Sequence, residues 1–579
     1  MKTTNLLLNI VFIAILFAGC NQDDIYDVTD AESTSMQNQA RVAEGVIPFT
    51  VENVNEALPN VLNYYHDHRP EVAERFGNYQ VNTTHIYYKF SPQDSIQQAR
   101  LMEVEETIQL TTQPFEFSPV EPTNDPDEDE IPVFYAIIES GTVIPDVPHE
   151  EIAQLHFTDE DKLEDTPSNY DEIEFKQNLM YETRKLAGHL DGEEIAEGYM
   201  NYHEGFEEGQ SGESMVTPMG LFGKKWRPSG NIRVEEDIVH TNNNNRSHTE
   251  GVKQARVNVL KWGWLQVEHG TTDNNGYFST GTTYTKNVHY KVKFKHDHVT
   301  VKAGNFYDTA SYFSGSHKRA PLNITFINSG ALSYYQFFAL IHNASYDYIN
   351  RVVSQYGLHS PGNLNISGKF NGTGSESGAQ WYPFNSAIRI ARLNKGGTYR
   401  GSDGIYATTV HELTHSGHRK MDPGMFSIFH LGNKERLLMQ ESWAEGVETI
   451  VTNDRYNNLY ATNGYGVYTA TGTSNISNNL TLGWNGNKQF ETIADMDEYT
   501  PLVIDLIDNI NQRVALNDPN LPIDRVSGYN LGEIKSALND ARTLQEWKNR
   551  LLNNFNNTSG PFIDDVFDYA EFVLHNNNL

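Results

Sequence analysis

The segment 410–418, VHELTHSGH, combines residue types that bind metal ions and move protons. His411 and His415 are four residues apart, and Glu412 follows the first histidine. On a helix, residues four apart lie on one face about a turn from each other, which is the spacing that lets two imidazoles share a tetrahedral zinc ion. Glu412 would lie beside that ion, where its carboxylate can accept a proton from a metal-activated water. The pattern therefore predicts a hydrolytic zinc site.

One helix must carry this motif, and the sequence predicts it over residues 402–417. A serine and an aspartate at its start are good caps, Gly417 marks its expected end, and Pro423 forbids continuation. His418 lies three residues beyond His415. We expect it either to contact the site or to act as a cation at the helix C-terminus.

A second predicted helix offers the third ligand. The segment KERLLMQESWAEGVETIV, residues 434–451, places Glu441, Glu445 and Glu448 along one stripe by the spacing of three to four residues. Acidic residues next to apolar ones such as Trp443 are not typical of a solvated helix face. A glutamate from this stripe would complete a His-His-Glu site and leave a fourth position open for water.

Together the two helices resemble those of the gluzincin metallopeptidases, the thermolysin-like clan. The resemblance implies Glu441 as the third zinc ligand and Glu445, four residues later, as the acid that orients a zinc-bound histidine. Reading WAEG as the W-x-x-E-G pattern of aminopeptidases would instead make Glu445 the ligand. The 25 residues between His415 and Glu441 suit the longer-looped gluzincins. A metzincin would need glycine at 418 and histidine at 421, whereas this chain has His418 and Met421.

The resemblance also implies an activity and further site residues. It implies hydrolysis of peptide bonds with Zn2+ as the cofactor and Glu412 as the general base. Gluzincins usually add a tyrosine or histidine that stabilises the oxyanion, and His430, Tyr456 and Tyr499 are the residues available for that role. The segment SAIRIARLNK, residues 386–395, stands where the clan keeps an edge strand that binds peptide by β-augmentation.

Residues 1–20 have the pattern of a bacterial lipoprotein signal peptide. Lys2 supplies a positive start, residues 6–18 are mainly apolar, and LFAGC closes the stretch at Cys20. LFAGC resembles a lipobox, which implies a lipid anchor on Cys20 and a place on the bacterial outer membrane or cell surface. The alternative is a cysteine that merely ends a cleaved signal peptide. Residues 21–45 are polar and are expected to form a flexible tether.

Charge limits the partners that this chain can have. Its 76 acidic and 43 basic residues give a net charge of −33, which argues against nucleic acid, because binding there depends on neutralising phosphates with Lys and Arg. The same charge disfavours docking on anionic lipid, so membrane contact is expected only through the lipid anchor. The expected partner is a protein or glycoprotein substrate.

The overall pattern predicts a multidomain α+β protein. A small α+β unit is expected at 46–118, followed by an acidic linker region at 119–168 and a helical connecting segment at 169–222. Residues 223–304 are rich in strand patterns and resemble the transthyretin-like β-sandwich modules attached to secreted peptidases. A mainly helical, zincin-type metallopeptidase domain is expected at 305–579.

Two functions of different classes fit these patterns. The leading hypothesis is a surface-anchored zinc endopeptidase. The alternative is a surface binding or adhesion lipoprotein that uses the β-sandwich, with the zinc helices as a non-catalytic scaffold. The intact Glu412 favours the enzyme, because a retired site can lose its general base without losing its fold.

Overall fold

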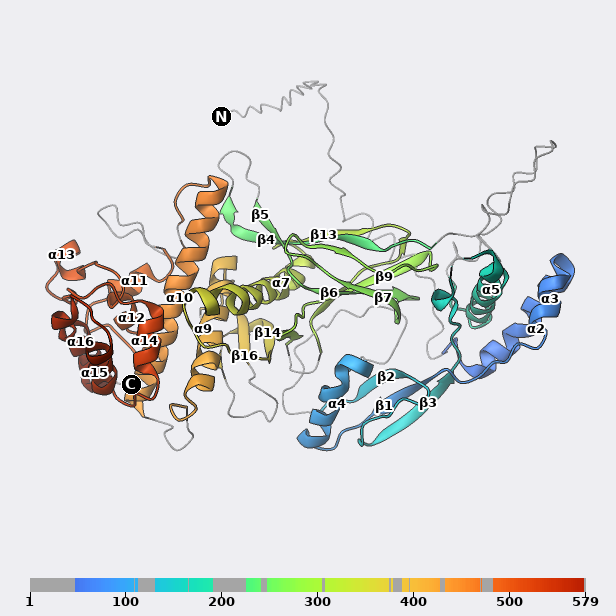
Figure 1. Ribbon diagram of the computed structural model, residues 1–579, viewed down its shortest axis with the longest axis horizontal. Coiled ribbons are helices and arrows are strands. Elements are labelled where there is room, and N and C mark those ends of the chain that lie inside the picture. Colours follow the sequence, from blue (N-terminus) through green and yellow to red (C-terminus); the bar gives the residue numbers. More distant parts are fainter. Residues whose placement is uncertain are drawn as a thin grey trace, which may run out of the picture.

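The computed structural model describes residues 47–108, 110–112, 131–164, 166–190, 225–240, 247–304, 308–373, 376–377, 388–394, 396–426, 433–468, 470 and 483–576. The expected signal peptide (1–20), the expected tether (21–45) and Cys20 lie outside these residues. Figure 1 shows an elongated molecule in which an N-terminal unit, a central group of sheets and a C-terminal group of helices follow one another. None of the described helices combines the length and apolar character needed for a membrane crossing.

The N-terminal unit consists of α2 (Val51–His68), α3 (Pro70–Phe76), β1 (His85–Phe90), α4 (Ser95–Ile108), β2 (Phe134–Glu139), β3 (His149–Leu155) and α5 (Tyr170–Leu186), with 3-10 turns at Glu160–Lys162 and Pro167–Asn169. β1 is the central strand of an antiparallel sheet, with β2 and β3 on either side. α5 packs against α2, and the two helices bury apolar side chains together with residues of β1 and β3.

This arrangement corrects the linker expected at 119–168. Both β2 and β3 fall within that range and pair with β1, so much of the range belongs to the folded unit. Phe134, Ala136 and Ile138 are buried on one face of β2, which is the two-residue period of a half-buried strand. The many prolines and acidic residues around these strands gave the range the composition of a linker, so its strands were not predicted. The helix expected in 169–222 is present as α5, and it belongs to the same unit.

The central strands are β4 (Ser229–His240), β5 (Ser247–Gly251), β6 (Arg256–Lys261), β7 (Leu265–Thr271), β8 (Tyr277–Ser279), β9 (Asn287–Lys293), β10 (Val299–Ala303), β11 (Ser311–Phe313), β12 (His317–Lys318), β13 (Leu322–Phe326), β14 (Leu364–Thr373), β15 (Glu376–Ser377) and β16 (Ile388–Leu393). In the described residues they form three sheets. The first has the strand order β11-β9-β6-β7, and β12 also pairs with β9. The second has the order β13-β4-β5, and β8 also pairs with β4. The third has the order β10-β14-β16-β15.

The expected boundary at residue 304 does not separate two folded units, because each of these sheets contains strands from both sides of it. β13 pairs in parallel with β4, and β10 pairs in parallel with β14. β11 and β12 pair with β9. One apolar core runs from Ile232 to Val573. The strand-rich region at 223–304 is therefore built into the unit that also contains residues 402–421 and 434–463, the two helices of the candidate site. The wider expectation of a mixed α and β architecture with several sheets is confirmed.

The helices of the C-terminal half are α7 (Leu332–Asp347), the π-helical turn Tyr348–Val352, α8 (Val353–Gln355), α9 (Ser402–Met421), α10 (Lys434–Asn463), α11 (Gly486–Gln489), α12 (Leu502–Asp505), α13 (Gln512–Leu516), α14 (Leu531–Leu538), α15 (Leu544–Asn554) and α16 (Asp564–Asn576), with a 3-10 turn at Gly560–Phe562. α9 packs against both α7 and α10. It thus lies at the junction between the sheets and the C-terminal helices (Figure 1).

The outer edge of β16 differs from the free edge strand expected at 386–395. β15 pairs with β16 at Ile388 and Arg389. Further along, the backbone carbonyl of Arg392 accepts a hydrogen bond from the Arg400 amide at 3.0 Å, and the Asn394 amide donates to the carbonyl of Thr398 at 2.9 Å. Because the returning chain occupies both ends of this edge, a peptide cannot add along its full length.

Candidate metal centre

α9 carries the His-Glu-x-x-His motif and is almost wholly buried. Its N-cap is Gly401 rather than the expected serine or aspartate, and its last residue is Met421, just before Asp422 and Pro423. Gly417 does not end the helix. A Cβ at this position would lie 2.4 Å from the carbonyl oxygen of His359, so glycine is needed there for close packing.

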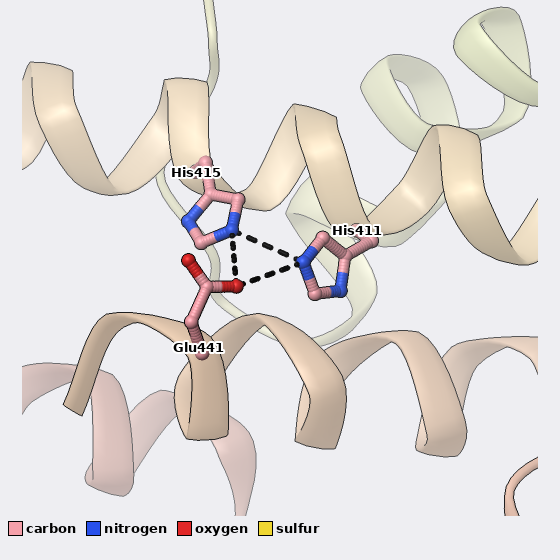
Figure 2. A group of neighbouring side chains, drawn as sticks. All are labelled: His411, His415 and Glu441. Carbon is pink, nitrogen blue, oxygen red and sulfur yellow. Dashed lines mark hydrogen bonds and ion pairs between the residues drawn. The ribbon is translucent and has the colours of Figure 1, made fainter. Parts of the chain in front are cut away.

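Three ligand atoms converge between α9 and α10 (Figure 2). The Nε2 atoms of His411 and His415 lie 3.1 Å apart, and Glu441 Oε2 lies 3.3 Å and 3.2 Å from them. Ligands about 2.0–2.1 Å from a tetrahedral zinc ion are about 3.3–3.4 Å from one another, so the three atoms have the spacing of one face of that tetrahedron. Two imidazoles and a carboxylate are also the donor types that zinc accepts. This group fits a bound metal ion.

The charges around the two histidines also favour a cation. Burial alone would lower the pKa of His411, yet Glu441 and Glu448 raise it well above its ordinary value. Burial likewise favours the neutral form of Glu441, but His415 and His411 hold the pKa of this carboxyl below its usual range. A positive charge between these side chains, carried by a proton or by a metal ion, is therefore stabilised.

Glu448 orients His411, a role that the resemblance gave to Glu445; in the described residues no hydrogen bond joins Glu445 to either histidine. The Nδ1 atom of His411 donates a hydrogen bond to Glu448 Oε2 at 2.8 Å, which directs the lone pair of Nε2 toward Glu441. α10 runs antiparallel to α9, because Glu448 faces His411 while Glu441 faces both histidines. Seven residues complete almost two helical turns, so Glu448 returns to the face of Glu441 more closely than Glu445 does.

Glu448 is itself held by a residue that the sequence did not indicate. Trp484 Nε1 donates to Glu448 Oε1 at 2.5 Å, so each carboxylate oxygen accepts one hydrogen bond from a ring N–H. The sequence placed Glu448 on the acidic stripe but gave it no role. Trp484 belongs to a later segment, and no local pattern connects it to α10.

Glu445 is a buried neighbour of the centre rather than a member of the His411–His415–Glu441 group. Burial and the nearby Glu448 raise the pKa of Glu445 to about 8. An oxygen of Glu445, an oxygen of Glu448 and a nitrogen of His411 lie within 4.8 Å of one another. The atom placed against both histidines nevertheless belongs to Glu441, as the preferred alignment of the motif predicts.

Glu412 has the environment of a general base. Its side chain is buried, and its Oε2 atom has no hydrogen-bond partner within the described residues. Burial raises the pKa of this carboxyl, which makes the carboxylate a stronger proton acceptor. The geometry thus places a free carboxylate oxygen on the residue next to the ligand His411.

Among the residues proposed for the oxyanion, the structure brings Tyr499 to the centre. Its ring centroid lies 6.0 Å from that of His411. Ser442, which follows the ligand Glu441 in α10, bonds the Thr500 hydroxyl at 2.7 Å and thereby anchors the loop that carries Tyr499. Tyr456 instead donates to the buried Glu236. His430 lies outside the described residues.

His418 is not the C-terminal cation that its position suggested. Burial lowers the pKa of this ring to about 3, so His418 is neutral near pH 7. Both ring nitrogens are buried without a hydrogen-bond partner in the described part of the chain, and the ring packs against Phe426. The helix C-terminus therefore gains no charge from it.

Comparisons with known proteins add no family assignment. No protein-family model matches the chain, and no curated protein matches it. The resemblance to the gluzincins therefore rests only on the motif residues of α9 and α10.

Proposed function

We propose that this protein is a zinc metallopeptidase in which His411, His415 and Glu441 bind the metal and Glu412 is the general base. The observation that carries the proposal is the mutual spacing of 3.1–3.3 Å among the three ligand atoms. The free Oε2 atom of Glu412 supports a hydrolytic use of the centre over a structural one. A structural zinc site would close the fourth position with another protein ligand.

The side chains around the centre suit the hydrolysis of an amide. When bound, zinc would polarise the scissile carbonyl and lower the pKa of a water toward ~7. Glu412 accepts the proton of the attacking water through its free oxygen and passes it to the leaving nitrogen. Tyr499 donates a hydrogen bond from its hydroxyl group to the oxygen on which negative charge develops. Glu448 keeps the His411 ring in the tautomer that leaves Nε2 free.

The lipoprotein signal pattern expected at residues 1–20 supports a proposal for the site of action. We propose that Cys20 carries a lipid anchor and that the peptidase acts on protein or glycoprotein substrates at the bacterial outer membrane or cell surface. A membrane-fractionation experiment tests the anchor. Wild type should partition with membranes, and Cys20→Ser should not do so after its signal peptide has been removed.

The alternative, an adhesion protein that uses a separate β-sandwich, receives no support from the strand pairing. Strands on both sides of residue 304 share sheets and one apolar core with the zinc helices. The buried oxygen of Glu412, which has no partner within the described part of the chain, likewise has no use in a scaffold, since leaving a buried polar atom unpaired is costly.

Metal analysis combined with product analysis tests the proposed function. Purified wild type should contain zinc and should release new termini from a complex protein mixture, read by mass spectrometry. Glu412→Gln should retain the zinc and release none. A metal-free wild type that cannot be loaded with zinc would overturn the proposal, and so would equal cleavage by wild type and Glu412→Gln.

A further inference from the structure

Arg400 lies near the metal centre, and two nitrogens of its guanidinium group have no hydrogen-bond acceptor in the described residues. It comes just before the start of α9, and its Nη1 atom donates to the Thr408 hydroxyl at 2.8 Å. Its Nε atom is buried and has no acceptor among the described residues, and no hydrogen bond of Nη2 is found there either. The edge formed by Nε and Nη2 is the one that can hold two oxygens in one plane. The side chain as a whole is partly exposed, whereas its Nε atom is buried.

The position of Arg400 is set by the face of α9 that carries the general base. Thr408 precedes Glu412 by four residues, so both lie on one face about one turn, or ~5.4 Å, apart. Glu448 and Glu412 are the acids whose charges act on Arg400, and within the described structure neither forms an ion pair with it. The guanidinium thus lies near these two acids, and in the described residues no acid neutralises it at contact distance.

A half-buried guanidinium whose Nε and Nη2 atoms have no acceptor in the described residues is suited to binding an anion. Burial lowers the pKa of Arg400, because removing its charge from water is unfavourable, while the two glutamates act in the opposite direction. A carboxylate matches the Nε–Nη2 edge with two parallel hydrogen bonds, whereas a single peptide carbonyl would use only one donor. Glu412, Glu441 and Glu448 would repel an acidic substrate unless a cation received it.

We propose that Arg400 binds a carboxylate of the substrate close to the scissile bond and so makes the site selective for acidic peptides. This inference rests on the proposed function. A helical turn of ~5.4 Å corresponds to one or two residues of extended peptide at ~3.3 Å each. The carboxylate would therefore belong to Asp or Glu within about two positions of the cleaved bond, or to the C-terminus of a short peptide. The two sources present the same chemistry to Arg400.

Matched peptides test this selectivity. The probes are fluorescent peptide pools that differ only in carrying Glu, Gln or Lys at each position in turn, each made with a free and with an amidated C-terminus. Wild type should cleave the best Glu peptide about 10- to 100-fold more efficiently, in kcat/KM, than its Gln counterpart, which is the range expected for a charge-assisted hydrogen bond. If amidation lowers cleavage whereas the Glu-to-Gln change does not, the terminal carboxylate is the ligand. If only the Glu-to-Gln change lowers it, the side chain is.

Variants separate the role of Arg400 from a general effect of charge. Arg400→Gln should lose the preference for Glu over Gln, and Arg400→Glu should prefer the Lys peptide. Arg525→Gln is the matched control, because it removes one positive charge from a surface pair with Asp565 and should keep the preference. Zinc content should be equal in all three variants, which shows that the metal centre is intact.

A binding measurement tests the role of Arg400 independently of peptide cleavage. The same peptides are titrated into Glu412→Gln, with and without Arg400→Gln, and followed by fluorescence anisotropy. Tighter binding of the carboxylate peptide that disappears with Arg400→Gln supports the inference even if no peptide is cleaved, in which case only the proposed peptidase activity fails. Cleavage and binding that change neither with the Glu-to-Gln substitution nor with amidation of the C-terminus overturn the inference and leave the proposed function standing.

Discussion

Glu448 stabilises the orientation of His411 through a carboxylate that accepts hydrogen bonds from two ring N–H groups, His411 Nδ1 at 2.8 Å and Trp484 Nε1 at 2.5 Å. Asn485 Nδ2 is a longer third donor, at 3.4 Å from Oε1. Glutamine has one acceptor oxygen, so in Glu448→Gln one of the two ring donors faces an amide NH2 and loses its partner. We expect Glu448→Gln to bind zinc more weakly, because the His411 ring is no longer fixed with Nε2 toward the other ligands.

The size of the loss can be worked from this contact. A hydrogen bond to a charged group contributes about 1.5–3 kcal/mol, which corresponds to about 10- to 150-fold in an equilibrium constant. Losing an outer partner of a metal ligand typically costs ~10–100-fold in affinity. We therefore predict a rise of about 10- to 100-fold in the Kd for zinc. Titration of metal-free protein against a chromophoric chelator measures it.

Two further variants test whether the loss of zinc affinity is specific to the contact between Glu448 and His411. Glu445→Gln changes the same chemical group one turn away and should cause a smaller loss, since the bond to His411 Nδ1 belongs to Glu448. Adding Trp484→Phe to Glu448→Gln removes the second donor and lets the amide oxygen face His411. Part of the affinity should then return, which a double-mutant cycle detects as coupling. If Glu445→Gln weakens zinc binding as much as Glu448→Gln, the assigned role of Glu448 is wrong.

Three other predictions follow from the fold and the site. A fragment of residues 305–579 should fail to fold, because β13 and β14 lose their parallel partners β4 and β10; a soluble fragment with native-like circular dichroism and one zinc per chain would contradict this. Tyr499→Phe should lower kcat by about 100-fold while zinc content is kept, as expected for losing an oxyanion donor, and unchanged kcat would remove the residue from the mechanism. Burial raises the pKa of Asp524 to about 7, so the stability from its protonated form is present below its ordinary pKa and is lost as pH rises through about 7. Asp524→Asn should therefore raise the melting temperature more at pH 8 than at pH 5, and an equal shift at both pH values would show that this carboxyl does not titrate as stated.

The histidine pair and the set of candidate glutamates could be predicted because helical geometry fixes their spacing, whereas the choice of Glu441 came from the resemblance to the gluzincins. His411 and His415 are one turn apart in any α-helix, and the acidic stripe limited the third ligand to a few glutamates. The role of Glu448 could not be predicted, because it depends on the antiparallel packing of α10 against α9. Arg400 has no motif of its own, and only the folded chain brings it near Glu412.

The domain boundaries failed for a different reason. Strand patterns show that a segment is extended, but they do not show its partner. Val299–Ala303 pairs with residues that begin at Leu364, and Leu322–Phe326 pairs with residues that begin at Gly230. These parallel pairings cross the residue where the composition changes from strand-rich to mixed. The mixed α and β character was predictable from periodicity, whereas the sharing of sheets was not.

Zinc content per chain tests the central claim most directly. It is measured by inductively coupled plasma mass spectrometry on wild type, Glu441→Ala and Glu412→Gln, purified and dialysed in parallel. The structure places Glu441 Oε2 within 3.3 Å of both histidine Nε2 atoms and gives Glu412 no such contact. We predict about one zinc per chain in wild type and Glu412→Gln, and substoichiometric zinc in Glu441→Ala, which keeps only two protein ligands. Full zinc in Glu441→Ala, or no zinc in wild type after loading, would contradict the proposed metal centre.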